Sequence, residues 1–312
     1  MNIERLRYLR VSVTSACNFH CSYCRPHGQS QLPVFAAPVE RLKESIRLMR
    51  NLGVDKVRFT GGEPTVYRHL IEIIRYSRSL DCDLHIALTT NGHLLERMAG
   101  PMAEAGLDSV NISLDTLDRE KFQSIAGVDS LDRVIEGIDC AVRHIPTVKL
   151  NCVIMDGLND CEAADMVTFA DEKKIDLRFI EYMPTKHNSE KARGFVCGDD
   201  IRKRLPWTLS PIESDRPAAA RYYGSPELGI RVGFINPVSH PFCGECNRVR
   251  LASDGRLYGC LFSGDSINLF DLLAKNSGAA ETAIERLVQS KLYRGCTAGA
   301  DGEYPSFVTM GG

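Results

Sequence analysis

Six short β-prone runs, separated by stretches with helical periodicity, constrain the fold of this chain more than any other feature of its sequence. Strands that alternate with helices form βα units, and consecutive βα units build a parallel sheet. The sequence therefore predicts an α/β fold: a partial (β/α)6 barrel, similar to a TIM barrel, of parallel strands. The expected strands are YLRVSVT (8–14), KVRFTG (56–61), DLHIALTT (83–90), SVNISLD (109–115), VKLNCVI (148–154) and DLRFIEYM (176–183).

The rhythm changes after about residue 185, where a polar run leads into irregular sequence that contains several prolines. Two extended pieces at 229–235 and 256–262 and helical patterns near 266–291 follow. We therefore expect two parts, the barrel over residues 1–185 and a smaller C-terminal region over residues 186–312.

The composition is that of an ordinary soluble globular protein, with 44% hydrophobic and 25% charged residues among 312. A net charge of −2 gives no global attraction to nucleic acid or to anionic membranes. No stretch approaches the roughly 18 apolar residues of a transmembrane helix, and the N-terminus lacks the apolar core of a signal peptide. The sequence thus predicts a cytoplasmic protein with no nucleic-acid partner and no membrane partner.

Twelve cysteines are more than such a protein needs. In a reducing cytosol, thiols serve metal binding or catalysis before they serve disulfides. Half of them form two triads at opposite ends of the chain, and that clustering is the strongest functional signal in the sequence. The triads are Cys17, Cys21 and Cys24 in CNFHCSYC, and Cys243, Cys246 and Cys260 in CGECNRVRLASDGRLYGC.

A triad of thiolates suits a [4Fe–4S] cube, because three protein ligands leave one of the four irons open to another molecule. Other interpretations stay open at this point. The spacing of the first triad also fits a buried stripe on one helix face, or a zinc site with His27 as fourth ligand. The second triad also fits structural zinc with His240. The ASDG segment (252–255) predicts a hairpin turn that brings Cys260 back toward the other two thiols of its triad.

The CxxxCxxC pattern directly after the first strand, with an aromatic residue before its last cysteine, resembles the radical S-adenosylmethionine enzymes. One strand later, FTGGEPT (59–65) is similar to the GGEP motif with which that family contacts the methionine amino group. In the family, the open iron binds the amino and carboxylate groups of S-adenosylmethionine. One electron from the cluster then yields a 5′-deoxyadenosyl radical that abstracts hydrogen from the substrate.

The chain resembles one branch nearly end to end, the MoaA-type GTP 3′,8-cyclases. This resemblance implies the first step of molybdenum cofactor biosynthesis, in which hydrogen is removed from C3′ of GTP and the C3′ radical attacks C8. The product would be (8S)-3′,8-cyclo-7,8-dihydroguanosine 5′-triphosphate. The resemblance also implies two [4Fe–4S] clusters, the second binding guanine, a flavodoxin- or ferredoxin-like electron donor, a downstream MoaC-type synthase and a homodimer. The matching segments include LRVSVTSACNFHCSYC, LTTNG, NISLD, RFIEYM, CNRVRL, DGRLYGCLF and the terminal Gly311 and Gly312.

The same resemblance assigns site residues by position, with both cysteine triads as cluster ligands. The residues implied to contact S-adenosylmethionine are Tyr23, Gly62, Ser113 and Met183. Those implied to contact GTP are Arg10, Arg58, Thr89, Lys149, Arg248 and Arg250, with Lys56 and Arg178 as further triphosphate ligands. The implied catalytic residues are Arg58, Arg248 and Arg250.

The residues themselves agree with this assignment in kind. Guanidinium groups match phosphate oxygens bidentately, and several cations directed into a barrel lumen are costly without an anion. A triphosphate is the kind of ligand that justifies them. The alternative is a set of outward-facing, solvated charges.

Three residues depart from the family pattern. The usual TDRC before the first triad is TSAC here, which places Ser15 and Ala16 there, and Arg25 stands where the family usually has Met. The departures leave room for a paralogue that keeps both clusters and acts on a different nucleotide. A reading from another class is a zinc- or cluster-stabilised nucleotide-binding module without radical chemistry.

Overall fold

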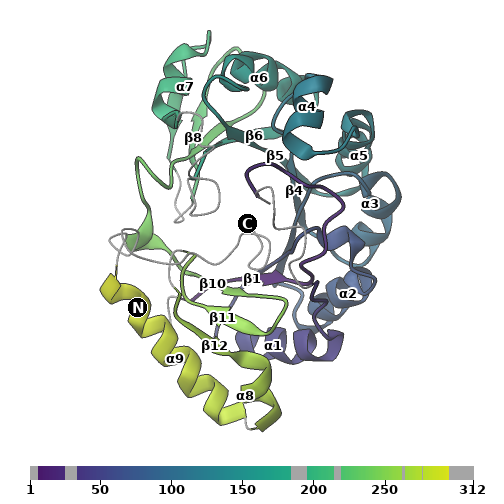
Figure 1. Cartoon of the computed structure of the whole chain (residues 1–312), viewed down its shortest axis with the longest axis vertical. Coiled ribbons are helices and arrows are strands. Elements are labelled where there is room, and N and C mark those ends of the chain that lie inside the picture. The colour runs from purple at the N-terminus through teal and green to yellow at the C-terminus, as the bar shows by residue number, and fades with distance from the viewer. Residues whose placement is uncertain are drawn as a thin grey trace.

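A computed structural model of the protein describes residues 6–24, 34–183, 195–213, 219–261, 264–275 and 277–294. Within these ranges, the strands form one twelve-stranded sheet in the order β12-β11-β10-β1-β2-β3-β4-β5-β6-β9-β8-β7. The sheet curves into an incomplete ring with helices on its outside (Figure 1). Arg25, His27, Gly311 and Gly312, which figure in the sequence predictions, lie outside the described residues.

All six predicted strands are present, and each pairs in parallel with the next along the chain. They are β1 (Tyr8–Ser12), β2 (Lys56–Thr60), β3 (His85–Thr90), β4 (Ser109–Ser113), β5 (Thr147–Ile154) and β6 (Asp176–Glu181). Helices connect them, as the alternating pattern predicted. They are α1 (Val39–Asn51), α2 (Leu70–Leu80), α3 (Leu95–Glu104), α4 (Arg119–Ala126), α5 (Leu131–His144) and α6 (Ala163–Glu172).

The first helix shows why these segments are helical and where they stop. Its buried residues Leu42, Ile46 and Met49 recur at intervals of three and four, so one stripe faces the sheet. The chain leaves the helix at Gly53, whose φ of +95° is a conformation that glycine adopts readily. The Val54 N–H donates to the Met49 carbonyl at 3.0 Å, which is the bond expected of this type of helix end.

The C-terminal region does not stand beside the barrel but extends its sheet at both edges. Strand β10 (Arg248–Leu251) pairs in parallel with β1, and β9 (Val232–Ile235) pairs in parallel with β6. Antiparallel strands continue the sheet outward on each side. The two ends do not pair with each other, so the partial barrel is confirmed. The outer strands are β11 (Arg256–Tyr258) and β12 (Ser266–Asn268) on one side, and β8 (Arg221–Gly224) and β7 (Ser210–Ile212) on the other.

The remaining helices are α7 (Gly198–Arg204), α8 (Leu269–Lys275) and α9 (Ser277–Arg294). The helical patterns expected near 266–291 are therefore preceded by a short strand, β12. The predicted ASDG turn joins β10 to β11, with Gly255 at a φ of +89°. In the strands next to this turn, Leu9, Val11, Val249 and Leu251 are fully buried on the helix-facing side, which leaves the alternate residues to the lumen.

Candidate active site

The first cysteine triad lies after β1 within residues 13–24, which contain no helix, so a stripe on one helix face is excluded. All three thiols are half-buried. The N–H of Phe19 points at the Cys17 Sγ, 3.4 Å away, as N–H groups do at cluster sulfurs. Burial raises the pKa of the Cys21 thiol, and the charges of Cys24, Asp115 and Cys17 raise it further. The three thiols therefore interact with one another. Their burial and the mutual repulsion of their thiolates favour the binding of one cationic group by all three.

The loop is held in place by elements from elsewhere in the barrel. The N–H groups of His20 and Ser22 each donate to carbonyls at the end of α4 at 2.9 Å. Asn91, which follows β3 in the TTNG segment, donates to the Asn18 side chain at 2.8 Å. Phe19 is buried, with its ring edge-on to two neighbouring rings. The positions of the ligands are thus fixed by the ends of other βα units.

The two glycines of the GGEP segment allow a close approach of two backbones. The Gly62 N–H donates to the Thr14 carbonyl at 2.7 Å, and the Glu63 N–H donates to the Ala16 carbonyl at 2.7 Å. A Cβ on Gly62 would lie 2.3 Å from the Ala16 carbonyl oxygen, and one on Gly61 would lie 2.5 Å from the Thr14 oxygen. Only glycine fits here, directly before the first triad.

The carboxylate of Glu63 is committed within the protein. It is 1% exposed and accepts hydrogen bonds from the Thr65 N–H and hydroxyl, the Thr90 hydroxyl and the Asn91 N–H at 2.6 to 3.0 Å. Burial raises its pKa, and these hydrogen bonds oppose that effect. Glu63 therefore ties the end of β2 to the end of β3. This carboxylate is therefore engaged within the protein, and the contact with S-adenosylmethionine is predicted at Gly62.

The Ser15 position, where the sequence departs from the family pattern, makes a local pair with Phe35. The Ser15 N–H donates to the Phe35 carbonyl at 2.8 Å, and the Phe35 N–H donates to the Ser15 hydroxyl at 2.8 Å. Ser15 is buried, and a short side chain suits that position. Nothing in the structure explains the choice of Ala16 beyond its small size.

The remaining predicted contacts for S-adenosylmethionine lie at the same ends of the strands. Tyr23 donates its hydroxyl to the Asp115 carboxylate at 2.9 Å, and burial raises the pKa of Asp115 to about 6. Ser113 is the last residue of β4, and Met183 follows the end of β6 by two residues. Asn151 pairs with Ser113 in register, and its Oδ1 is buried with no partner among the described residues. The alternation of side chains in VKLNCVI places Asn151 on the same face as Lys149, and this pattern could have indicated Asn151 as a site residue.

The predicted cations face one another across the strands of the lumen. In the sheet register, Arg10 lies between Arg250 and Arg58. One layer below, Tyr8 lies between Arg248 and Lys56. Because alternate residues of a strand point to the same side, all of these side chains face the interior. The alternative of outward-facing, solvated charges is therefore wrong for this group.

Arg58 is held by hydrogen bonds to three other residues of the barrel. Its side chain is 4% exposed. It donates to the Tyr8 hydroxyl at 2.7 Å, to the Leu88 carbonyl at 2.6 Å and to the Thr89 hydroxyl at 3.2 Å. Thr89 thus contacts this wall of cations, and its contact with GTP stays a prediction.

The opposite wall carries Lys149 and Arg178. The Lys149 Nζ donates to the Tyr222 hydroxyl at 3.2 Å and lies 3.5 Å from the Asp176 carboxylate. The Nε and Nη2 atoms of Arg178 are buried and have no hydrogen-bond partner among the described residues. Such donors are costly unless a ligand accepts from them.

The electrostatics show that these cations crowd one another. Burial, reinforced by Arg58, Lys149 and Arg178, lowers the pKa of Lys56 to about 8. Burial, reinforced by Arg10 and Arg248, lowers the pKa of Arg250 to about 9. An anion in the lumen would relieve both penalties, because it would favour the charged forms.

The second triad lies at the opposite ends of the parallel strands from the first, near the N-terminal end of β10. Cys243 begins a single 3-10 turn, η5 (Cys243–Glu245), Cys246 precedes β10, and Cys260 follows β11. The Lys291 Nζ of α9 donates to the Cys246 Sγ at 3.2 Å and also to the Arg248 carbonyl. Burial alone would raise the pKa of Cys246, but Lys291 and Arg248 lower it. Nothing in the sequence distinguishes Lys291 from other helix lysines.

A second buried carboxylate holds the loop before this triad, as Glu63 does for the first. Glu181 is 2% exposed and accepts from the N–H groups of Gly198, Val238 and Ser239 at 3.0 to 3.2 Å, and from the Ser239 hydroxyl. His240, the alternative zinc ligand, places its Nε2 2.9 Å from the Asp199 carboxylate. That nitrogen is therefore already engaged.

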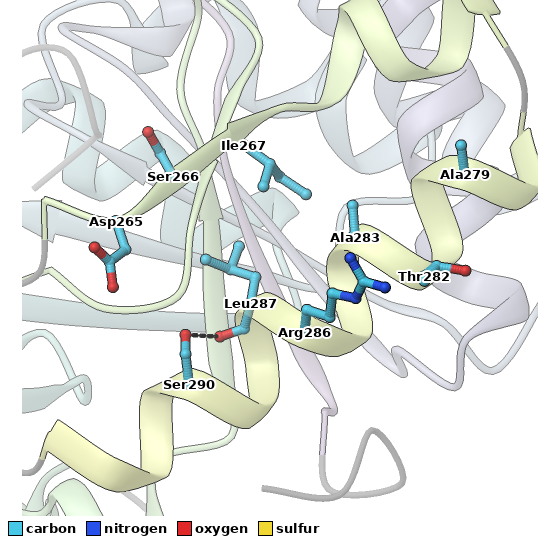
Figure 2. A pocket seen from close by; sticks show the side chains of 9 residues that line it. All are labelled: Asp265, Ser266, Ile267, Ala279, Thr282, Ala283, Arg286, Leu287 and Ser290. Atoms are coloured by element: carbon cyan, nitrogen blue, oxygen red, sulfur yellow. Dashed lines mark hydrogen bonds between the residues drawn. The ribbon is translucent and has the colours of Figure 1, made fainter.

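Two other features of the described residues lie away from this site. One is a surface cluster of potential metal ligands after α2, Asp81, Cys82 and Asp83, whose ligand atoms all lie within 4.8 Å of one another. A surface pocket of about 690 Å³ lies between β12 and α9, and Figure 2 shows the Ser290 hydroxyl bonded to the Leu287 carbonyl on its helical wall. None of the predicted site residues lines this pocket. Its lining residues are Asp265, Ser266, Ile267, Ala279, Thr282, Ala283, Arg286, Leu287 and Ser290.

Comparison with known proteins gives consistent matches along the chain. Residues 11–170 match the radical SAM superfamily, and residues 175–295 match Molybdenum Cofactor Synthesis C. A GTP 3′,8-cyclase of Alkaliphilus oremlandii is 39% identical over 92% of this chain and 91% of its own length. One of Marinobacter nauticus is 42% identical over 85% of this chain and 82% of its own length.

Among solved structures, Streptococcus suis SuiB bound to S-adenosylmethionine superimposes with a TM-score of 0.61 at 17% identity. The match covers 85% of this chain and 63% of that structure, and it shows the fold alone. No helix among the described residues is long and apolar enough to cross a membrane. Together, the matches over both parts of the chain establish that it belongs to the radical S-adenosylmethionine superfamily and, within it, to the GTP 3′,8-cyclase family.

Proposed function

We propose that this protein converts GTP to (8S)-3′,8-cyclo-7,8-dihydroguanosine 5′-triphosphate, the first step of molybdenum cofactor biosynthesis. The observation that carries the proposal is the interior wall of cations between two cysteine triads. The sheet register places Arg10, Arg58 and Arg250 side by side in the lumen, with the first triad after the C-terminal end of β1 and Cys246 before the N-terminal end of β10. A triphosphate supplies the charge that these side chains need, and its nucleoside end can then reach both triads.

The donor groups of the first triad fit a [4Fe–4S] cluster with one open iron. The three half-buried thiols interact with one another, and a backbone N–H points at one of the sulfurs. When bound there, the cluster and S-adenosylmethionine supply the one-electron chemistry that begins the reaction. The residues proposed to hold S-adenosylmethionine are Tyr23, Gly62, Ser113 and Met183.

The second triad is proposed to hold a second [4Fe–4S] cluster that binds guanine, so that residues 186–312 supply the substrate cluster and residues 1–185 the radical cluster. Three thiolate ligands on a cube leave one iron open, which is where guanine is proposed to bind. The bond from Lys291 to the Cys246 sulfur further favours the thiolate form that a cluster requires.

The protein's own residues are proposed to bind and orient the nucleotide. Arg248 and Arg250 alternate along β10, so both guanidiniums reach the lumen beside the second triad. Arg58 is fixed by its three hydrogen bonds and so needs little reorganisation to meet a phosphate. Lys56, Lys149 and Arg178 complete the set around the triphosphate, while Arg10 and Thr89 line the same wall.

Three partners are proposed on the family resemblance: a flavodoxin- or ferredoxin-like electron donor, a MoaC-type synthase that consumes the product, and a second copy of this chain in a homodimer. The proposed chemistry uses one electron for each S-adenosylmethionine, and that electron has to come from an outside reductant.

An anaerobic assay with GTP and other nucleotides tests the proposal. With S-adenosylmethionine and a reductant, GTP should give 5′-deoxyadenosine and a cyclised triphosphate, identified by mass and by its rearrangement with a MoaC-type synthase. Turnover with another nucleotide but not with GTP would show a paralogue with a different substrate. Colourless protein that contains zinc and forms no 5′-deoxyadenosine would refute radical chemistry altogether.

Lys291→Met should change the second cluster without removing it. The variant loses a hydrogen bond and a positive charge at the Cys246 sulfur, and both stabilise the reduced, more negative cluster. We expect unchanged iron content, a lower reduction potential of the second cluster, and a loss of about 1 kcal/mol in stability from the broken bond to the Arg248 carbonyl. Lys291→Arg is the control, since it keeps the charge. An unchanged potential in the Met variant would show that Lys291 has only a structural role.

A further inference from the structure

Among the described residues of the lumen wall, Tyr8 contacts several of the cations and has no part in the proposed function. It is the first residue of β1, is half-buried, and lies between Arg248 and Lys56 in the sheet register. Its hydroxyl accepts from the Arg58 Nε at 2.7 Å and is also hydrogen-bonded to the Arg10 side chain. Its ring lies 5.4 Å from the Lys56 Nζ and 5.7 Å from the Arg248 guanidinium carbon.

The chemistry of this neighbourhood is one-sided. Guanidinium and ammonium groups are donors only, whereas a phenol both donates and accepts and a phenolate only accepts. Lys56, Arg58 and Arg248 have no carboxylate within 4.0 Å among the described residues. Asp176, a carboxylate on the opposite wall, is shared by Lys149 and Arg231. Donors around the Tyr8 oxygen favour its deprotonated form.

We infer that Tyr8 is a positioning residue of the triphosphate site, whose hydroxyl oxygen holds Arg58 and Arg10 in the lumen until a triphosphate takes over as their partner. The displaced oxygen then takes up one proton from solvent, so the step converts a phenolate and a proton to a phenol. No electron moves. The inference rests on the proposed function in so far as a triphosphate is the ligand.

The electrostatics of the wall agree with this geometry. Burial alone would raise the pKa of Tyr8, but the surrounding cations outweigh it and lower the pKa to about 7. An anion of several charges in the same space cancels that field, so the pKa of the bound state returns toward the ordinary value of about 10. The groups that act on Tyr8 are Arg10 on its own strand, Lys56 and Arg58 on β2, Arg248 and Arg250 on β10, and Arg178 on β6.

The sign of the pH dependence follows from these two states. Between about pH 7 and pH 10 the complex holds more protons than the free protein, so triphosphate affinity is highest below about pH 7 and falls as the pH rises. One titrating group changes the affinity by at most about tenfold per pH unit. Lys56 adds a second contribution of the same sign, because its pKa is lowered to about 8 before the anion binds.

Binding of inorganic triphosphate to the anaerobic, cluster-loaded protein tests the inference without the guanine ring, which titrates itself. Calorimetry in two buffers of different ionisation enthalpy measures the protons taken up, and the ultraviolet absorption of tyrosinate reports Tyr8 directly. We expect proton uptake near pH 8 and a loss of tyrosinate absorption on binding. Tyr8→Phe should show no tyrosinate signal and should take up almost one proton fewer on binding. Its affinity should also fall less steeply as the pH rises. In the absence of its competing oxygen, this variant should bind several-fold more tightly than the parent above pH 8.

Two further variants separate the contributions. Lys56→Arg should keep the tyrosinate signal while losing the lysine proton. Tyr223→Phe is the matched control, because Tyr223 follows the lumen-facing Tyr222 on β8 and points to the opposite face, with its ring 5.0 Å from Arg202. This variant should behave as the parent. Equal proton uptake and equal pH dependence in Tyr8→Phe and the parent, with iron content intact in both, would overturn the inference. A normal Tyr8 signal in a protein that does not cyclise GTP would instead refute only the proposed function.

Discussion

Cys243→Ser should abolish cyclisation of GTP while leaving the first cluster in place. Removing one of three thiolates leaves the second site with Cys246 and Cys260, too few ligands to hold a cube. The first triad lies at the end of β1 and is held by contacts to α4 and β3, none of which involves the second triad. Iron should therefore fall from about eight to about four per chain. The affinity for S-adenosylmethionine should stay unchanged, and the affinity for GTP should fall at least about tenfold because guanine loses its iron.

Iron and sulfide analysis, together with binding of each ligand by anaerobic calorimetry, measures this outcome. Cys161→Ser is the matched control, since Cys161 is an exposed thiol outside both triads. An iron content of about eight in Cys243→Ser would show that Cys243 is not a ligand. A protein that loses all iron and unfolds would show that the second triad is a structural element for the whole barrel.

The six barrel strands and the interior face of their cations could be predicted because both depend on local pattern. The alternation in KVRFT puts Lys56 and Arg58 on one face whatever the rest of the chain does, and the register then brings them to β1. The two cluster sites with an open iron could be predicted because each triad offers three thiolates, whereas a [4Fe–4S] cluster has four irons.

The placement of the C-terminal strands could not be predicted in the same way. Arg248 lies beside Tyr8 because β10 joins the sheet next to β1, although the two residues are 240 positions apart in the chain. The NRVRL segment shows that its two arginines share a face but contains no signal for the strand it will pair with. A domain attached to the barrel was the natural expectation, and an extension of the same sheet is what the chain forms.

The supporting residues of the site were missed for a related reason. Glu181 and Glu63 each act through four hydrogen bonds to groups on other segments, which only the folded chain brings together. Lys291 reaches Cys246 from a helix at the far end of the chain. Charged residues in such positions look, in sequence, like solvated surface groups. Their burial and their partners are tertiary facts, and the triads depend on them for the geometry of the loops that present the thiols.

Gly62→Ala should empty the first cluster site. Both neighbours of the added methyl group are backbone atoms: the Ala16 carbonyl oxygen at 2.3 Å and the Ser15 carbonyl oxygen at 2.6 Å. Neither can swing aside as a side chain would. The segment would have to move by about an ångström, breaking the bonds from Gly62 to Thr14 and from Glu63 to Ala16. Because Ala16 directly precedes Cys17, this displacement moves the first ligand. We expect a loss of at least about 3 kcal/mol in stability.

The measured consequence should be selective for the first site. Iron should fall from about eight to about four per chain, and 5′-deoxyadenosine formation should be undetectable, while binding of GTP at the second site persists. Gly244→Ala is the control, because Gly244 lies inside the second triad but a Cβ there meets no atom within 4 Å. The control should keep its full iron content and its activity. If Gly62→Ala also kept its full iron content and activity, the two backbones could separate without moving Cys17. The packing of the GGEP segment against residues 14–16 would then not be what positions the first ligand. The opposite result, loss of activity in both variants, would mean that any added methyl group near a triad is harmful, and that the close contact at Gly62 has no special role.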